Sequence, residues 1–195
     1  PSEGQILVDG RPVGQSNLRN WQQSVGYVPQ DIFLVDDSVR TNIALGVDAE
    51  ELDEARLRHS ARIAQLEEFI TKELPQGFDT LLGERGVRLS GGQRQRIGIA
   101  RALYHDADLI LFDEATSALD NLTEREVITA VEALPGDKTV LMIAHRLSTL
   151  RDCDRIIVLE AGKVTGFDTW DALQHGNRVF RSIAEGQISL TGAAS

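Results

Sequence analysis

Short apolar runs alternate along the chain with longer segments in which apolar residues recur every three or four positions. The runs are rich in branched residues and predict strands at residues 5–8, 25–29, 109–113, 138–144 and 155–159. Helical spacing predicts helices at residues 52–71, 90–104, 123–134 and 177–184. Because the strands are apolar throughout, we expect burial on both of their faces. The alternation predicts an α/β fold with a mainly parallel sheet.

Two segments depart from this alternation. Residues 41–86 lack a run that predicts a buried strand, which indicates a helical insertion. The end of the chain is small and polar and predicts a flexible tail at residues 187–195. We therefore expect a core built from residues 1–40 and 101–186, with a helical subdomain at residues 41–100.

The helix expected at residues 123–134 has recognisable ends. Thr123 and Glu126 have the spacing of a capping box, in which two side chains accept hydrogen bonds from the first backbone amides. Pro135 and Gly136 predict the stop.

The composition limits which cellular compartment and which classes of partner fit this protein. The 195 residues suffice for one domain with a sizeable core, and no stretch approaches the ~18 consecutive apolar residues of a membrane helix. A formal net charge of -10 argues against a nucleic-acid surface, which needs clustered lysine and arginine. Phosphate chemistry in so acidic a chain is explained if the phosphate ligand arrives with a divalent cation. The single Cys153 excludes an internal disulfide and fits a reducing compartment such as the cytoplasm.

Two carboxylates end the strand expected at residues 109–113. Asp113 and Glu114 follow its apolar residues directly, and open α/β sheets bind ligands at the carboxyl ends of their strands. If the chain turns at Asp113, the two acids point apart and can serve a magnesium shell and a water molecule. The alternative, that the pair only caps the next helix, is equally well supported by these two residues alone.

A glycine-rich segment opens the helix expected at residues 90–104. Gly91 and Gly92 let a ligand approach the backbone at a helix N-terminus, where free amides attract anions. Ser90 fits two roles, a helix cap and a hydroxyl donor to a phosphate oxygen.

Positive charge follows on the same helix, at Arg94, Arg96 and Arg101. Cations near a helix N-terminus are unfavourable, so this charge favours a bound anion. At helical spacing from Ile97, Arg101 also fits a buried structural ion pair.

Three patterns then occur in a fixed order: Leu89-Ser90-Gly91-Gly92-Gln93, the run from Ile110 to Asp120, and Ala144-His145-Arg146. Together they closely resemble the nucleotide-binding domain of ATP-binding cassette transporters. In that family they are the signature motif, the Walker B strand with its catalytic glutamate and D-loop, and the switch histidine. Tyr27-Val28-Pro29-Gln30 looks like the Q-loop. The resemblance covers residues 4–184 and implies a P-loop NTPase (RecA-like) fold, a mainly parallel α/β core with a helical signature subdomain.

The resemblance assigns nucleotide binding to five residues. Ser90, Gly91, Gly92 and Gln93 would bind ATP that is held by a second nucleotide-binding domain. Asp120 would contact that domain across a head-to-tail dimer.

Catalysis is assigned to four further residues. Asp113 would hold Mg²⁺, and Glu114 would act as the base that activates the attacking water. Gln30 would reach the magnesium or that water, and His145 would contact the γ-phosphate. As isolated residues, Gln30 fits a solvent-facing turn and His145 a surface position.

The phosphate loop of this chemistry, Gly-x-x-x-x-Gly-Lys-Ser/Thr, does not occur in the sequence. The only lysines are Lys72, Lys138 and Lys163, and none follows such glycines. In the family this loop lies upstream of the position that matches the first residue here. We therefore expect an N-terminally truncated domain whose own phosphate site binds ATP weakly or not at all.

The resemblance implies the ATP-hydrolysing motor of an exporter-type transporter at the cytoplasmic face of the cell membrane. Its expected partners are a second nucleotide-binding domain and a transmembrane domain, and not nucleic acid. A soluble cassette protein acting on DNA or ribosomes is disfavoured by the acidic charge and by the compact segment between Gln30 and Ser90. A non-catalytic domain of the same fold is disfavoured by the presence of Glu114 and His145.

Overall fold

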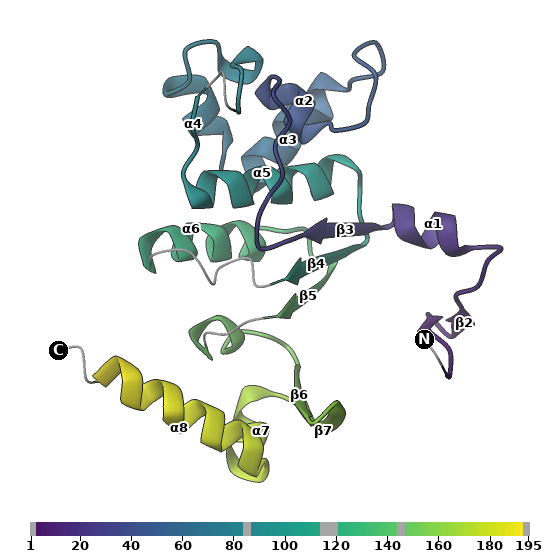
Figure 1. The fold of residues 1–195 in the computed structure, drawn as a ribbon, viewed down its shortest axis with the longest axis vertical. Helices are drawn as coiled ribbons and strands as arrows, with labels where there is room; N and C mark the ends of the chain where they lie inside the picture. The colour runs from purple at the N-terminus through teal and green to yellow at the C-terminus, as the bar shows by residue number, and fades with distance from the viewer. Residues whose placement is uncertain (1–2, 84–86, 114–120, 144–146, 193–195) are drawn as a thin grey trace. The chain divides into compact units, whose positions relative to one another are not determined.

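The computed structural model describes residues 3–83, 87–113, 121–143 and 147–192 (Figure 1). It separates into two compact units, residues 1–143 and residues 144–195, and each is described by itself. This boundary differs from the expected division into a core and a helical subdomain, which stays a prediction.

A parallel sheet is the centre of the first unit. It consists of β3 (Val25–Val28), β4 (Leu109–Asp113) and β5 (Thr139–Ile143), in that order. The predictions of these strands and of their parallel direction are confirmed. Val28, Ile110 and Phe112 are completely buried. Burial on both faces is wrong for β5, an edge strand of this sheet whose Leu141 and Ile143 are exposed.

One long helix links the sheet to the helical part of the unit. Helix α5 (Gly91–Tyr104) lies along β3, and α6 (Asn121–Glu132) packs against α5 (Figure 1). The approach of α5 to the sheet depends on Gly26, because a Cβ added there would lie 2.5 Å from the Cβ of Ala102. The helix thus rests on bare backbone.

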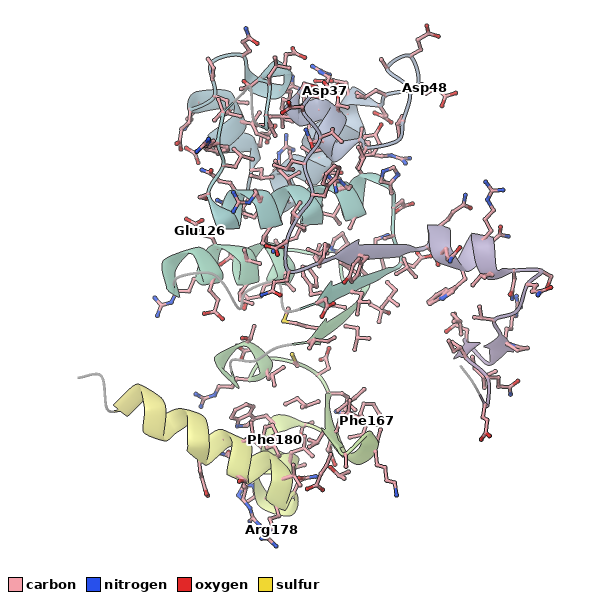
Figure 2. The ribbon with its side chains drawn as sticks, viewed as in Figure 1. Asp37, Asp48, Glu126, Phe167, Arg178 and Phe180 are labelled. Atoms are coloured by element: carbon pink, nitrogen blue, oxygen red, sulfur yellow. The ribbon has the colours of Figure 1, made fainter. Side chains whose placement is uncertain are left out.

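Helix α6 begins two residues before its predicted start, so the expected capping pair of Thr123 and Glu126 does not form its N-terminus. Glu126 instead makes a 2.9 Å ion pair with Arg96 of α5. Figure 2 shows Glu126 on the side of α6 that faces α5.

The helical part lies on the far side of α5 from the sheet (Figure 1). It contains α2 (Val39–Ile43), α3 (Glu54–Ile63), α4 (Glu67–Lys72) and the 3₁₀ turn η1 (Gly77–Asp79). The single helix predicted for residues 52–71 is wrong. The chain breaks at Gln65, whose φ of 56° is left-handed and cannot continue a right-handed helix. The break lets Ala64 and Leu66 on either side be fully buried.

The prediction of a buried strand at residues 5–8 is also wrong. Residues 5–8 contribute only β1 (Leu7–Val8), which pairs antiparallel with β2 (Arg11–Pro12). Asp9 and Gly10 have φ values of 49° and 74°, the positive angles of a type I′ hairpin turn. Leu7 is 52% exposed, so this strand is not part of the buried sheet. Helix α1 (Leu18–Gln23) then leads into β3.

The second unit is a hairpin packed on helices. The 3₁₀ turn η2 (Leu147–Leu150) precedes β6 (Ile156–Glu160), which pairs antiparallel with β7 (Lys163–Asp168). The strand predicted at residues 155–159 is therefore confirmed, but its partner was not predicted and the pair is antiparallel. The turn between them again has two positive φ values, 47° at Ala161 and 74° at Gly162.

Two helices complete this unit, α7 (Trp170–Gly176) and α8 (Arg178–Gly192). Phe180 of α8 packs with Leu173 of α7 and with Ile156 and Val158 of β6, and its ring meets Trp170 edge-on. Sequence patterns predicted α8 but not α7, and α8 extends through residues 187–192 of the expected flexible tail.

Substitution of Gly26 by alanine is expected to destabilise the protein by about 1–3 kcal/mol, because the new methyl group would overlap the backbone and Cβ of Ala102. Gly136→Ala is the matched control: its added Cβ meets no atom within 4 Å, and we expect a change within about 0.5 kcal/mol. Thermal unfolding followed by circular dichroism compares the two variants. Equal melting temperatures would show that α5 does not depend on the bare backbone of β3.

Candidate functional site

The carboxyl ends of β3 and β4 form one edge of the sheet. Val28, the last residue of β3, is in register with Phe112, so Pro29 and Gln30 leave the sheet near Asp113. Asp113 is half-buried and is in register with Ile143, the last residue of β5. Open α/β sheets bind their ligands at this edge.

Three of the predicted site residues, Glu114, Asp120 and His145, lie outside the described residues, and their roles stay predictions. In sequence Glu114 follows Asp113 directly, and His145 comes shortly after Ile143. Because Asp113 and Ile143 are paired, the chain enters both segments from the same edge of the sheet.

Asp113 has a different partner from either of those considered from the sequence. Its Oδ2 accepts a 2.8 Å hydrogen bond from the hydroxyl of Tyr27 on β3. The alternative that the pair of Asp113 and Glu114 caps the next helix stays a prediction, because residues 114–120 lie outside the described residues. The hydrogen bond to the carboxylate is the main cause that raises the pKa of the Tyr27 phenol. Sequence reasoning missed Tyr27 because its proximity to Asp113 follows only from the register of the two strands.

The glycine-rich segment forms a complete capping box at the start of α5. The backbone amide of Gln93 donates to Ser90 Oγ at 3.2 Å, and the amide of Ser90 donates to Gln93 Oε1 at 2.8 Å. In this arrangement the Ser90 oxygen accepts, and its hydroxyl proton is left to donate to a ligand. The amides of Gly91 and Gly92 have no acceptor within the helix because they belong to its first turn. Capping and anion binding are therefore compatible roles for Ser90.

The arginines of α5 do not require an anion. Arg94 donates to the carbonyl of Leu89 at 2.7 Å, and Arg96 is paired with Glu126. Arg101 donates to the carbonyls of Asn42 and Phe33, at 2.9 and 3.2 Å. Among the described residues no carboxylate pairs with Arg101, so the expected buried ion pair is not found there and carbonyl oxygens are its partners. Burial lowers the pKa of Arg101.

A buried glutamine connects the two parts of the site. The side-chain amide of Gln95, one turn into α5, donates to the carbonyls of both Pro29 and Gln30. The structure therefore brings the start of α5 and the segment after β3 into direct contact. No hydrogen bond between described residues joins Ser90 or Gln93 to Asp113, so those groups stay separate here.

The described residues hold no group of three or more histidine, cysteine, aspartate or glutamate side chains that would bind a metal by themselves. Magnesium, however, usually takes only one or two carboxylates and completes its shell with water and substrate phosphates. Asp113, at the sheet edge with only one oxygen engaged by Tyr27, fits that requirement.

A cavity of about 460 Å³ lies beside β3. Val25, Gly26, Tyr27, Arg101 and His105 are among its lining residues. Tyr27, which donates to Asp113, therefore borders both this cavity and the carboxyl edge of the sheet. Within the part of the chain that the structure describes, no helix is both long and apolar enough to cross a bilayer.

A family model described as "ABC transporter" matches residues 1–117 of the chain. The chain belongs to the ABC transporter family. The predicted resemblance and the P-loop NTPase fold class are thereby confirmed, and the domain is one that binds ATP.

Relatives of this ABC domain include ATP-dependent flippases. It is 45% identical over 184 residues to an ATP-dependent lipid A-core flippase of Cupriavidus pinatubonensis, covering 94% of this chain and 31% of the flippase. It is 49% identical over 164 residues to the heterocyst differentiation ATP-binding protein HepA of Nostoc sp., covering 84% and 26%. These matches support an exporter-type domain.

A solved structure gives the same result. A bacterial Atm1-family ABC exporter with ATP bound superposes with a TM-score of 0.80 at 40% identity, over 95% of this chain and 32% of the exporter. The ABC domain described here therefore spans about a third of the length of such relatives.

The hydrogen bond between Tyr27 and Asp113 can be tested by titration. Asp113→Asn removes the negative acceptor, so we expect the phenol pKa of Tyr27 to fall toward its ordinary value of about 10. Tyrosinate absorbance distinguishes the two proteins, with Tyr27→Phe identifying the signal of Tyr27 against that of Tyr104. An unchanged titration in Asp113→Asn would contradict the contact.

Proposed function

We propose that this chain is part of the ATP-hydrolysing motor of an exporter-type ABC transporter. Cycles of nucleotide-dependent dimerisation would drive transport, with the domain at the cytoplasmic face of the membrane. Its partners would be a transmembrane domain and a second nucleotide-binding domain in a head-to-tail dimer. The names of the relatives, flippases and exporters that are about three times as long, support this assignment.

The observation that carries the proposal is the N-terminus of α5. Two open amides, at Gly91 and Gly92, and the hydroxyl proton of Ser90 are held in place by the capping box. A helix N-terminus of this kind favours a negatively charged group such as a terminal phosphate. In the proposed head-to-tail dimer, the nucleotide bound at Ser90 would be held mainly by the partner domain.

The part of the site at Asp113 fits a magnesium ion. Asp113 would hold Mg²⁺ through its water shell, and the ion would neutralise charge on the phosphates in an overall acidic chain. Gln30 would contribute to the same shell or orient the attacking water.

The remaining roles belong to residues that the structure does not describe. Glu114 would accept a proton from the attacking water as it approaches the γ-phosphorus in line, and the bond to the leaving ADP oxygen would break. His145 would donate a hydrogen bond to a γ-phosphate oxygen, and Asp120 would contact the partner domain.

The base assignment predicts that Glu114→Gln in the full-length protein reduces ATP turnover by about 10²-fold or more, since general base catalysis contributes about that factor. ATP binding and ATP-dependent dimerisation should persist, because the amide has the shape of the carboxylate. Phosphate release and light scattering measure the two effects. Turnover close to the original rate would refute the role of Glu114.

Ser90→Asp separates phosphate binding from helix capping. Aspartate is a good helix cap, so this variant should melt at or above the original temperature. If Ser90 contacts a phosphate, however, the added carboxylate repels it, and we expect ATP turnover to fall by about 10²-fold, the scale for loss of one such contact. Ser90→Ala is the complementary control, since it loses the cap without adding charge. Normal turnover in Ser90→Asp would show that Ser90 is only a cap.

A further inference from the structure

Three residues on one face of α5 contact the segment that comes directly after β3. Gln95, Gly98 and Arg101 are spaced by three positions, which places them in one row along the helix. In the same order they meet residues 29–30, residue 32 and residue 33. The helix that begins at Ser90 and the segment that begins at Gln30 therefore run alongside each other.

Gln95 makes the first of these contacts. It is buried, and its Nε2 donates to the carbonyls of Pro29, at 3.2 Å, and of Gln30. Both acceptors are carbonyl oxygens, so the amide must present its nitrogen to them and cannot be turned the other way round. The link is therefore specific to an amide donor.

The oxygen of the same side chain explains why this contact matters. Gln95 Oε1 is buried and accepts no hydrogen bond from any residue that the structure describes. A buried polar atom without a partner destabilises a protein, and an apolar side chain of equal length would avoid this penalty. A glutamine is therefore unfavourable here as a core side chain. Its contribution is the two hydrogen bonds to the carbonyls of Pro29 and Gln30.

The second and third contacts hold the rest of the segment to the helix. A Cβ added to Gly98 would lie 2.5 Å from Ile32 Cδ1 and 3.3 Å from Val28 Cγ1, so α5 and this segment are closely packed. Arg101 donates to the carbonyl of Phe33. Between them these contacts leave little room for α5 to shift along its axis without moving residues 29–33.

We propose that Gln95 is a positioning residue that transmits a displacement of the N-terminus of α5, at Ser90, to Gln30. When a phosphate at the N-terminus of α5 moves the helix, Gln95 pulls the backbone of Pro29 and Gln30 with it and brings the Gln30 side chain into or out of its working position. This inference rests on the proposed ATPase function. It adds that the site at Ser90, which would bind the nucleotide held by the partner domain, controls the position of Gln30, which would serve the other nucleotide.

The geometry also explains how so small a link affects chemistry. Displacements of about 1 Å at a positioning residue can change a rate by about 10²-fold. Gln95 acts on the backbone of Gln30 itself, so its loss would leave Gln30 present and misplaced.

A double-mutant cycle in the full-length protein tests the link. Gln95→Met keeps the length of the side chain and removes the amide, and we expect kcat for ATP hydrolysis to fall about 10-fold or more with a smaller change in KM, within the range expected for misplaced catalytic groups. In a Gln30→Ala background the same substitution should change kcat by less than about twofold, because the residue through which it acts is gone. The same factor in both backgrounds would overturn the proposal.

Hydrogen exchange gives a readout that does not depend on turnover. ATP with the Glu114→Gln variant should protect the backbone of residues 89–93 and of residues 29–33. Adding Gln95→Met should abolish the protection of residues 30 and 31, next to the carbonyls that Gln95 binds, and preserve that of residues 89–93. Unchanged protection of residues 30 and 31 in the presence of Gln95→Met would also overturn the proposal.

Ile99→Val is the matched control for simple destabilisation of α5. Ile99 is completely buried on the same helix and makes no polar contact with residues 29–33. Its effect on kcat should be equal with and without Gln30→Ala, and the protection of residues 29–33 should persist. Absence of any ATPase activity in the unsubstituted full-length protein would refute the proposed function, whereas additivity at Gln95 in an active protein refutes only this inference.

Discussion

The close contact between α5 and β3 is the constraint on which the first unit depends. Gly26 lacks a side chain where Ala102 rests, and the helix consequently lies against the backbone of the strand. Interiors are packed too densely for such a contact to give way in one place only. The position of β3 therefore fixes the end of α5 that carries Ala102. A single helix thus connects the sheet to the glycine-rich segment at Ser90.

Much of this arrangement was accessible from the sequence. The apolar runs at β3, β4 and β5 and the helix at Ser90 were predicted because each pattern is long and its ends are marked by a turn, a carboxylate or a cap. The site residues were named because short motifs in a fixed order carry more information than composition. Charge alone gave the opposite indication, since an acidic chain would not be expected to bind phosphate without a cation.

What the sequence did not predict depends on the third dimension. The two hairpins were missed because their turns, at Asp9-Gly10 and Ala161-Gly162, were not recognised as the positive-φ turns they form. The break at Gln65 was missed because burial of Leu66 outweighs helical spacing. Tyr27 and Gln95 were missed for a different reason, because their partners are distant in the sequence and only strand register and helix packing bring them together.

The capping box at Ser90 has a consequence for the kinetics of assembly. The Ser90 oxygen serves the helix and its proton is left over, so the loop has its final shape before any ligand arrives. In the proposed dimer, little conformational entropy would then be lost at this surface when a nucleotide carried by another domain reaches it. The encounter of two domains, and not the ordering of a loop, would set the rate at which such a complex closes. Opening of the proposed complex would be correspondingly sensitive to the charge on the nucleotide, because the helix N-terminus favours a negatively charged group.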